Sequence, residues 1–262
     1  MEIIGSGFLA GALAPLAASH PHAVAAAFGV SYASGVPEAE FTREAVRLYE
    51  LLRDCERRRR TLVFFSTASP AMYALPGQAG REDGPVFPST AYGRHNLALE
   101  AVLAASGVDH LVLRLAHVVG PGQPGHLLVP AMVRQVRSGR VRLHRGARRD
   151  LIDVADVVTV LDRLLETGVN RTVVNVASGR AVPIESLVDH IEARLGTRAA
   201  RTYVDGEVSG AVSTARLHRL VPEIARTGEE DYHRRVLDTY LGAYAADGAV
   251  ADPRPDPVRH PT

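Results

Sequence analysis

The 262-residue sequence contains no lysine, because all 30 of its basic residues are arginines. An arginine side chain stays charged in proteins and cannot serve as a base whose pKa is adjustable. The absence therefore excludes every mechanism that needs a lysine amine or ammonium group.

Cysteine is almost absent as well, since Cys55 stands alone. One cysteine forms neither a disulfide framework nor a cysteine metal site within a chain. Its place in a helical pattern predicts a packed or partly exposed thiol. The eleven histidines show no spacing typical of a metal site, so we expect no metal.

A long uninterrupted apolar segment is also lacking. Residues 8–30 are mostly apolar, but Pro15, His20 and Pro21 interrupt them and no basic segment comes before them. This pattern favours neither a membrane span nor a signal peptide. We expect a cytoplasmic protein without a membrane partner.

The formal net charge is only +1, which gives no broad basic surface for a nucleic acid. Arg57–Arg60 is the one dense basic run. It fits a solvated helix end, where cations suit the negative end of the helix dipole, and a targeting or nucleic-acid role is the alternative. With 46% hydrophobic residues, the chain can form one large domain, or one domain and a small lobe.

Apolar strand-like segments alternate with helical ones along the first 120 residues and again near residues 150–178. Such alternation is typical of α/β folds, so we predict a doubly wound Rossmann-type parallel sheet with right-handed crossovers. About fifty residues separate Gly7 from Thr61, and one βα repeat takes about thirty. Only one strand and one helix fit there, so the first half of the sheet is predicted to be shortened.

The remaining segments predict a small C-terminal substrate lobe. We expect residues 1–120, completed by about 150–178, to form an NAD(P)-binding domain. Residues 121–149 and 179–245 would form the substrate-binding lobe. Residues 246–262, rich in Pro, Asp and Arg, are predicted to be a disordered tail.

A glycine motif lies at the start of the chain. Residues 5–10 read Gly-Ser-Gly-Phe-Leu-Ala, which fits G-x-G-x-x-A between a strand and a helix. Glycines allow a tight turn and close approach of the backbone to a pyrophosphate at a helix N-terminus. Taken alone the motif is weak, and Ala25, Ala26 and Ala27 stand where an acidic residue for the ribose is usual.

Six segments, taken in order, resemble the extended short-chain dehydrogenase/reductase family, the NAD-dependent epimerase/dehydratase group that acts on nucleotide sugars. They are GSGFLA, LVFFSTASPAMYA, YGRHNLALE, LRLAHVVGPG, RRDLIDVADVV and VNVASGRAVPIESL. The resemblance covers most of the chain, except the region before residue 61 and the tail. It implies the fold more firmly than the chemistry, because function depends on the site.

The resemblance implies a catalytic role for Tyr92, as the proton donor to a carbonyl or the base for an alcohol. It places Ser69 where a hydroxyl polarises the substrate oxygen, with Thr67 as a competitor for that role. The family has a lysine one helical turn after the tyrosine, on the same face, and here that residue is Asn96. Asn96 can donate a hydrogen bond, but it brings no charge. His95 can supply a proton or simply be a surface or core histidine.

The remaining implied contacts concern an NAD or NADP cofactor and a small-molecule substrate. The resemblance assigns cofactor contacts to Gly5, Ser6, Gly7, Phe8, Leu9, Ala33 and Ser66. It assigns substrate contacts to Thr67, His117 and Arg149. Arg149 alternatively pairs with Asp150, Asp153 or Asp156, and the last two more simply orient loops or cap the following helix.

A phenol without a neighbouring ammonium keeps a pKa near 10, which harms oxidation and epimerisation more than reduction. We therefore expect an NAD(P)H-dependent ketoreductase acting on a nucleotide-linked ketosugar in antibiotic or glycan biosynthesis. Three alternatives are open: a reductase of a polyketide or other natural-product ketone, an epimerase or dehydratase of nucleotide sugars, and a non-catalytic dinucleotide-binding or regulatory protein. A cofactor-independent isomerase or cyclase also stays open, and the family implies a possible homodimer through the Tyr92 helix and its predecessor.

Overall fold

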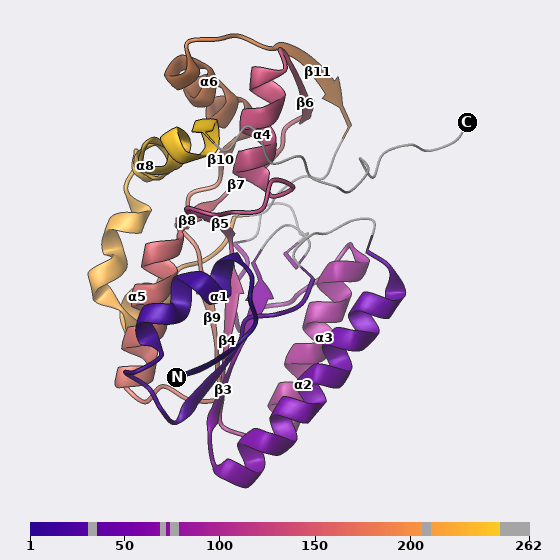
Figure 1. The fold of residues 1–262 in the computed structure, drawn as a ribbon, viewed down its shortest axis with the longest axis vertical. Helices are drawn as coiled ribbons and strands as arrows, with labels where there is room; N and C mark the ends of the chain where they lie inside the picture. Colours follow the sequence, from indigo (N-terminus) through magenta and orange to yellow (C-terminus); the bar gives the residue numbers. More distant parts are fainter. Residues whose placement is uncertain (31–35, 69–71, 74–78, 206–210, 247–262) are drawn as a thin grey trace.

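The computed structural model describes residues 1–30, 36–68, 72–73, 79–205 and 211–246. A five-stranded parallel sheet forms its centre (Figure 1), with the strand order β1-β2-β3-β4-β9. The strands are β1 (Glu2–Ile4), β2 (Ala23–Ala26), β3 (Thr61–Thr67), β4 (His110–Leu115) and β9 (Thr172–Val176). The predicted α/β class and parallel sheet are therefore confirmed.

Strand β1 lies at an edge of this sheet. Strand β2 pairs with β1 on one side, with Val24 opposite Glu2, and with β3 on the other, with Val24 opposite Leu62. Among the described residues, no strand pairs with the free edge of β1. This arrangement confirms that the first half of the sheet is short.

Helices cover both faces of the sheet. Figure 1 shows α1 (Phe8–Leu13) and α5 (Val154–Glu166) on one face, and α2 (Glu38–Arg58) and α3 (Ala91–Ala105) on the other. The path from β1 through α1 to β2 and the path from β2 through α2 to β3 both advance by one strand in the same direction. Because their helices lie on opposite faces, the two crossovers have opposite hands. The expectation that all crossovers are right-handed is thus wrong for one of them.

The central strands are buried on both faces, as is usual for parallel sheets. Ala25 and Val63 belong to a cluster with α1 and α5, whereas Val24 and Leu62 belong to a second cluster with α2 and α3. Alternate residues of each strand therefore point to opposite faces, and the two clusters fix the strands from either side.

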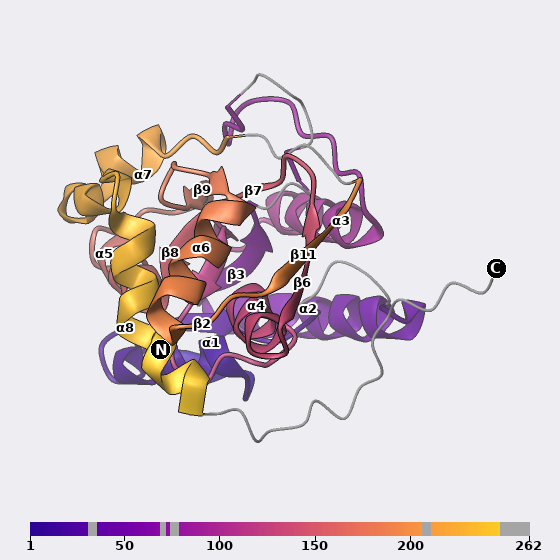
Figure 2. The same ribbon diagram turned by 90° about the horizontal axis from the view of Figure 1, so that it is seen from above.

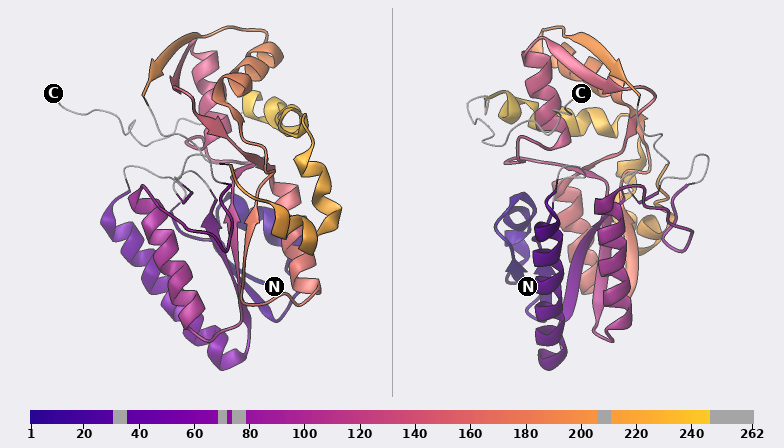
Figure 3. Two further views of the ribbon diagram at one scale, coloured as in Figure 1. Left: turned by 180° about the vertical axis from the view of Figure 1, so that it is seen from behind. Right: turned by 90° about the vertical axis from the view of Figure 1, so that its right-hand side faces the viewer.

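The second half of the chain builds a smaller lobe, which Figures 2 and 3 show beside the sheet. Three two-stranded sheets belong to this half of the chain: β5 (His117–Val119) with β8 (Leu151–Asp153), β6 (Arg140–His144) with β11 (Ala200–Val204), and β7 (Arg148–Arg149) with β10 (Val182–Pro183). Helices α4 (Leu128–Arg137), α6 (Ile184–Leu195) and α8 (Tyr232–Ala246) accompany these strands, whereas α7 (Ala215–Leu220) packs against β9 of the central sheet. Short 3-10 turns cover Ala14–Leu16 and Pro222–Gly228. Its assignment as a substrate lobe stays a prediction, and residues 247–262 of the predicted tail lie outside the described residues.

Several local predictions are confirmed. The arginine run ends α2, where Arg59 is the left-handed C-cap and Arg57 and Arg58 are exposed. Gly196 closes α6 with a positive φ of 63°, and Cys55 is buried at 1% exposure. Within the described ranges, no helix is long and apolar enough to cross a bilayer.

Candidate active site

A cavity of about 720 Å³ lies at the carboxyl ends of the first four sheet strands. This is the edge at which open α/β sheets bind ligands, and its size is typical of small-molecule sites. Most of the predicted site residues line this one cavity: Gly5, Ser6, Gly7, Phe8, Leu9, Ser66, Thr67, Tyr92 and His117. Ala33 and Ser69 lie outside the described residues.

The glycine turn forms one end of the cavity. Gly5 has a φ of +151°, and a Cβ there would overlap the carbonyl oxygen of Ala27. A Cβ on Gly7 would meet nothing within 4 Å. Gly5 is therefore needed for close packing of the turn against the end of β2, whereas Gly7 leaves open space above the turn.

Tyr92 stands at the start of α3. Thr90 caps this helix by accepting a hydrogen bond of 3.0 Å from the backbone N–H of Gly93. Burial and the Glu44 carboxylate raise the pKa of Tyr92 to about 12, although hydrogen bonds with Asn96 and Thr67 act in the opposite direction. The phenol is consequently protonated at neutral pH, with the Thr67 hydroxyl beside it.

Asn96 is a buried residue of α3 that contacts the backbone of Tyr92. Its side chain is 3% exposed, and its Nδ2 donates a hydrogen bond of 3.0 Å to the backbone oxygen of Tyr92. Asn96 is not among the residues that line the cavity. One helical turn after Tyr92 there is thus a neutral amide that folds back onto its own helix.

Glu44 is a site residue that the sequence did not reveal. It lies on the buried face of α2 with Leu48, Leu52 and Cys55, whereas Val46, an apolar residue of this helix, is 52% exposed. The three- and four-residue spacing of these buried positions was the available signal. A glutamate among apolar residues at that spacing indicates a buried carboxylate with a partner.

His95 is that partner. Its Nε2 lies 3.3 Å from Oε2 of Glu44, a contact that lacks hydrogen-bond geometry, and its ring packs against Phe41 with centroids 4.6 Å apart. The backbone N–H of Val30 also donates to Glu44 Oε2, at 3.1 Å. Glu44 and His95 are therefore two titratable groups in contact, and His95 lies three residues after Tyr92 on α3.

His117 lies on the opposite side of the cavity. Burial, followed by the charge of Arg149, lowers the pKa of His117 to about 3. Its Nε2 is buried without a hydrogen-bond partner, and the residue lines the cavity. Arg149 itself is not among the cavity-lining residues.

The aspartates suggested as partners of Arg149 have other contacts. Asp150 accepts hydrogen bonds from the backbone N–H groups of Ser178 and Gly179 at 2.8 and 2.9 Å. Asp153 caps α5 through the N–H of Ala155, and Asp156 pairs with Arg226 at 2.8 Å. The helix-cap interpretation of Asp153 is confirmed. No group of histidine, cysteine, aspartate and glutamate side chains within the described ranges is arranged for a metal.

A buried polar network adjoins the cavity through Ser66. The Ser66 hydroxyl donates to Glu100, and Glu100 forms an ion pair of 2.6 Å with Arg114. Both charged side chains are buried, at 6% and 4% exposure. Arg114 continues the network by donating a hydrogen bond of 2.6 Å to the Tyr73 hydroxyl.

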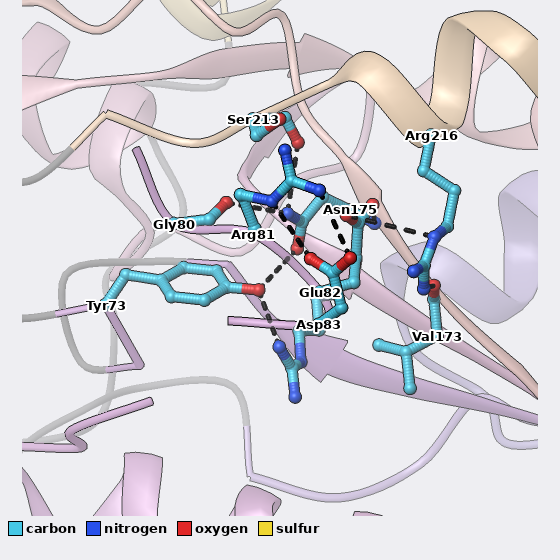
Figure 4. Close-up of polar contacts among 10 residues, drawn as sticks. Tyr73, Gly80, Arg81, Glu82, Asp83, Val173, Asn175, Ser213 and Arg216 are labelled. Carbon is cyan, nitrogen blue, oxygen red and sulfur yellow. Dashed lines mark hydrogen bonds and ion pairs between the residues drawn. The ribbon is translucent and has the colours of Figure 1, made fainter. Parts of the chain in front are cut away.

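Figure 4 shows where this network ends. The Tyr73 hydroxyl donates to Asn175 Oδ1 at 2.8 Å, and Asn175 Nδ2 donates to the backbone oxygens of Gly80 and Ser213 at 3.0 and 3.1 Å. The network therefore ties Tyr73, in the segment after β3, to strands β4 and β9.

Comparison with known proteins agrees with this arrangement. The structure resembles that of RMD from Pseudomonas aeruginosa in complex with NADPH, with a TM-score of 0.77 and 22% identity, over 93% of this chain and 98% of the other. It also resembles a dTDP-glucose 4,6-dehydratase from Bacillus anthracis in complex with NAD, with a TM-score of 0.75 and 17% identity, over 93% and 79% of the two chains.

A curated relative, the dTDP-6-deoxy-L-talose 4-dehydrogenase (NAD(P)(+)) of Kitasatospora kifunensis, is 34% identical over 143 residues. The match covers 49% of this chain and 44% of the relative, so the chain spans less than half of that protein's length. The family model of the NAD dependent epimerase/dehydratase family matches residues 10–177, which is more than half of the chain. With the parallel sheet, the cavity at its carboxyl edge and Tyr92 within it, this match shows that the chain belongs to the NAD dependent epimerase/dehydratase family.

Proposed function

We propose that the protein is an NAD(P)H-dependent reductase that acts on a ketone of a nucleotide-linked sugar. The observation that carries the proposal is the protonated Tyr92 phenol beside the Thr67 hydroxyl in the cavity. The similarity to a 4-dehydrogenase of a dTDP-linked deoxysugar supports the class of substrate.

The cavity fits one end of an NAD(P) molecule. The open space above Gly7 suits the pyrophosphate, because glycines permit close approach of the backbone. The pair formed by Thr67 and Tyr92 at the cavity suits polar groups of the nicotinamide end and the substrate. Strand β1 ends the sheet, so the described residues hold the nicotinamide end and offer no paired strand beyond β1 for the adenosine.

When bound, the reduced nicotinamide supplies a hydride for the substrate carbon. Thr67 would donate a hydrogen bond to the ketone oxygen, and Tyr92 would transfer its hydroxyl proton to that oxygen as negative charge develops. Neutral His117 would orient the substrate without adding charge. Ser69 stays a candidate for the role that we give to Thr67.

The raised pKa of Tyr92 favours reduction over the other reactions of the family. A reduction needs the phenol as an acid, and at neutral pH it is almost fully protonated. Oxidation of an alcohol and proton abstraction for epimerisation need the phenolate, which a pKa near 12 makes scarce. The Glu44 charge raises the pKa of Tyr92, and the absence of lysine means that no ammonium group lowers it.

Replacement of Tyr92 by Phe tests the proposal. The substrate is the 4-keto product formed by oxidation of dTDP-6-deoxy-L-talose, offered with NADH and with NADPH, and the loss of absorbance at 340 nm is followed. We expect turnover to fall about a hundredfold or more, the size of a general-acid contribution, with cofactor binding unchanged. Tyr49→Phe is the matched control, because Tyr49 is 48% exposed on α2.

Two results would contradict the proposal. Equal turnover of the Tyr92→Phe variant and the wild type would remove the phenol from the chemistry. Cofactor binding without any consumption of the ketosugar by the wild type would instead favour a non-catalytic dinucleotide-binding protein.

A further inference from the structure

Glu44 is buried and His95 is partly buried, and the proposed reaction assigns no proton transfer to either of these titratable groups. Glu44 is 8% exposed, and the His95 side chain is 12% exposed. They come from different helices, α2 and α3, and meet with 3.3 Å between Oε2 and Nε2. A contact of this kind between buried groups requires an explanation.

The pair lies in a wall between two hollows. Phe28, Gly29, Val30 and Arg47 line the inner cavity that contains Tyr92, and the same four residues line an outer hollow of about 570 Å³ on α2. Glu44 also lines the outer hollow. A Cβ on Gly29 would overlap the Glu44 carboxylate, so Gly29 packs directly against this carboxylate.

On the inner side, helix α3 carries both Tyr92, which lines the inner cavity, and His95. Tyr92 and His95 are three residues apart and therefore share a helix face. Asn96 cannot exchange a proton, and its amide is bonded to the Tyr92 backbone. The groups that face His95 are Glu44 and Phe41 from α2, and Arg47 stands close by with its guanidinium 4.5 Å from the Phe28 ring centroid.

Each reduction would leave Tyr92 without its proton. In the family the lysine stands next to the tyrosine, but this chain contains none. Among the described residues, the Glu44 charge acts on Tyr92, and His95 contacts Glu44 from the same helix as Tyr92. These two groups offer a route by which a proton could return.

On the basis of the proposed function, we propose that Glu44 and His95 pass a proton from the outer hollow to Tyr92 after each reduction. The Tyr92 O–H bond breaks as the O–H bond of the product alcohol forms. The phenolate then takes a proton from the pair, and the pair takes one from water in the outer hollow. Both residues act through Tyr92 and do not touch the substrate.

Comparison of the first turnover with steady-state turnover tests this path. For the single turnover, the Glu44→Gln variant or the His95→Ala variant is mixed in excess over the ketosugar. For the steady state, each variant is used in catalytic amounts. We expect the first turnover to stay within about twofold of wild type, because Tyr92 starts protonated, and the steady-state rate to fall at least about tenfold. Glu56→Gln, on an exposed residue of the same helix, should change neither rate.

Chemical rescue separates a proton path from a packing role. Added imidazole should restore steady-state turnover of His95→Ala several-fold, and Glu44→Asp, which keeps the carboxylate, should retain more turnover than Glu44→Gln. Equal losses in the first and later turnovers, or no rescue by imidazole, would overturn the inference. A wild type that performs no first turnover would instead contradict the proposed function, so the two failures are distinguishable.

Discussion

At the scale of single residues, the proposed reaction depends on Tyr92, whose ionisation governs the pH dependence expected of its rates in the two directions. With a pKa near 12, reduction should show no alkaline loss from Tyr92 between pH 7 and 10, because the acid form persists. Oxidation of the product alcohol should rise about tenfold per pH unit over the same range, because it needs the phenolate. Initial rates in both directions measure this, and an alkaline loss of reduction below pH 9 would contradict it.

His117 should make the protein sensitive to acid. Its folded-state pKa of about 3 lies below the ordinary value of 6.5, so the unfolded chain binds a proton first as the pH falls. The stabilising contribution is complete above pH 6.5 and is lost toward pH 3. Urea unfolding should show that wild type loses at least about 1 kcal/mol more than His117→Asn between pH 7 and 4.5. His22→Asn, on an exposed residue, is the control and should behave as wild type.

Tyr73 acts at the scale of elements, because its hydroxyl joins the segment after β3 to strands β4 and β9. Tyr73→Phe would leave Arg114 and Asn175 each with one unpaired polar group. We expect a loss of about 1–3 kcal/mol in the free energy of unfolding, the usual cost of buried unpaired groups. Thermal unfolding of Tyr73→Phe measures this loss, and Tyr203→Phe is the control because Tyr203 is 38% exposed. Equal midpoints for both variants would refute it.

Much of the element order could be predicted from the sequence, because long amphipathic helices such as α2 and α5 carry a strong periodic signal. Strand β11 was not predicted, since its five residues pair with β6 about sixty residues away and local patterns carry no such information. The opposite hands of the first two crossovers were also missed, because each hand depends on which face of the sheet the helix covers.

The candidate site, too, could be predicted from the sequence only in part. The family motifs located Gly5, Gly7, Thr67, Tyr92 and His117, which the fold gathers around one cavity. Glu44 and His95 could not be paired from the sequence, because their contact arises only when α2 packs on α3. The homodimer through these two helices stays a prediction.

The shortened sheet matters at the scale of the whole molecule. Adenosine of a dinucleotide has no described strand beyond β1 to hold it, and no acidic residue follows at the usual distance. We expect NADH, NADPH and reduced nicotinamide mononucleotide to bind with dissociation constants within about fivefold of one another, or roughly 1 kcal/mol. Fluorescence titration of the three measures this, and NADH binding a hundredfold tighter than the mononucleotide would show that another part of the chain holds the adenosine.

The same edge strand bears on how the protein behaves in concentrated solution. An open strand edge offers backbone groups that can template intermolecular β-pairing. Here the edge is only three residues long, and its exposed Glu2 forms an ion pair with Arg60. Short length and a charge are the features that deter fibril growth at natural sheet edges, so we expect this edge to resist aggregation.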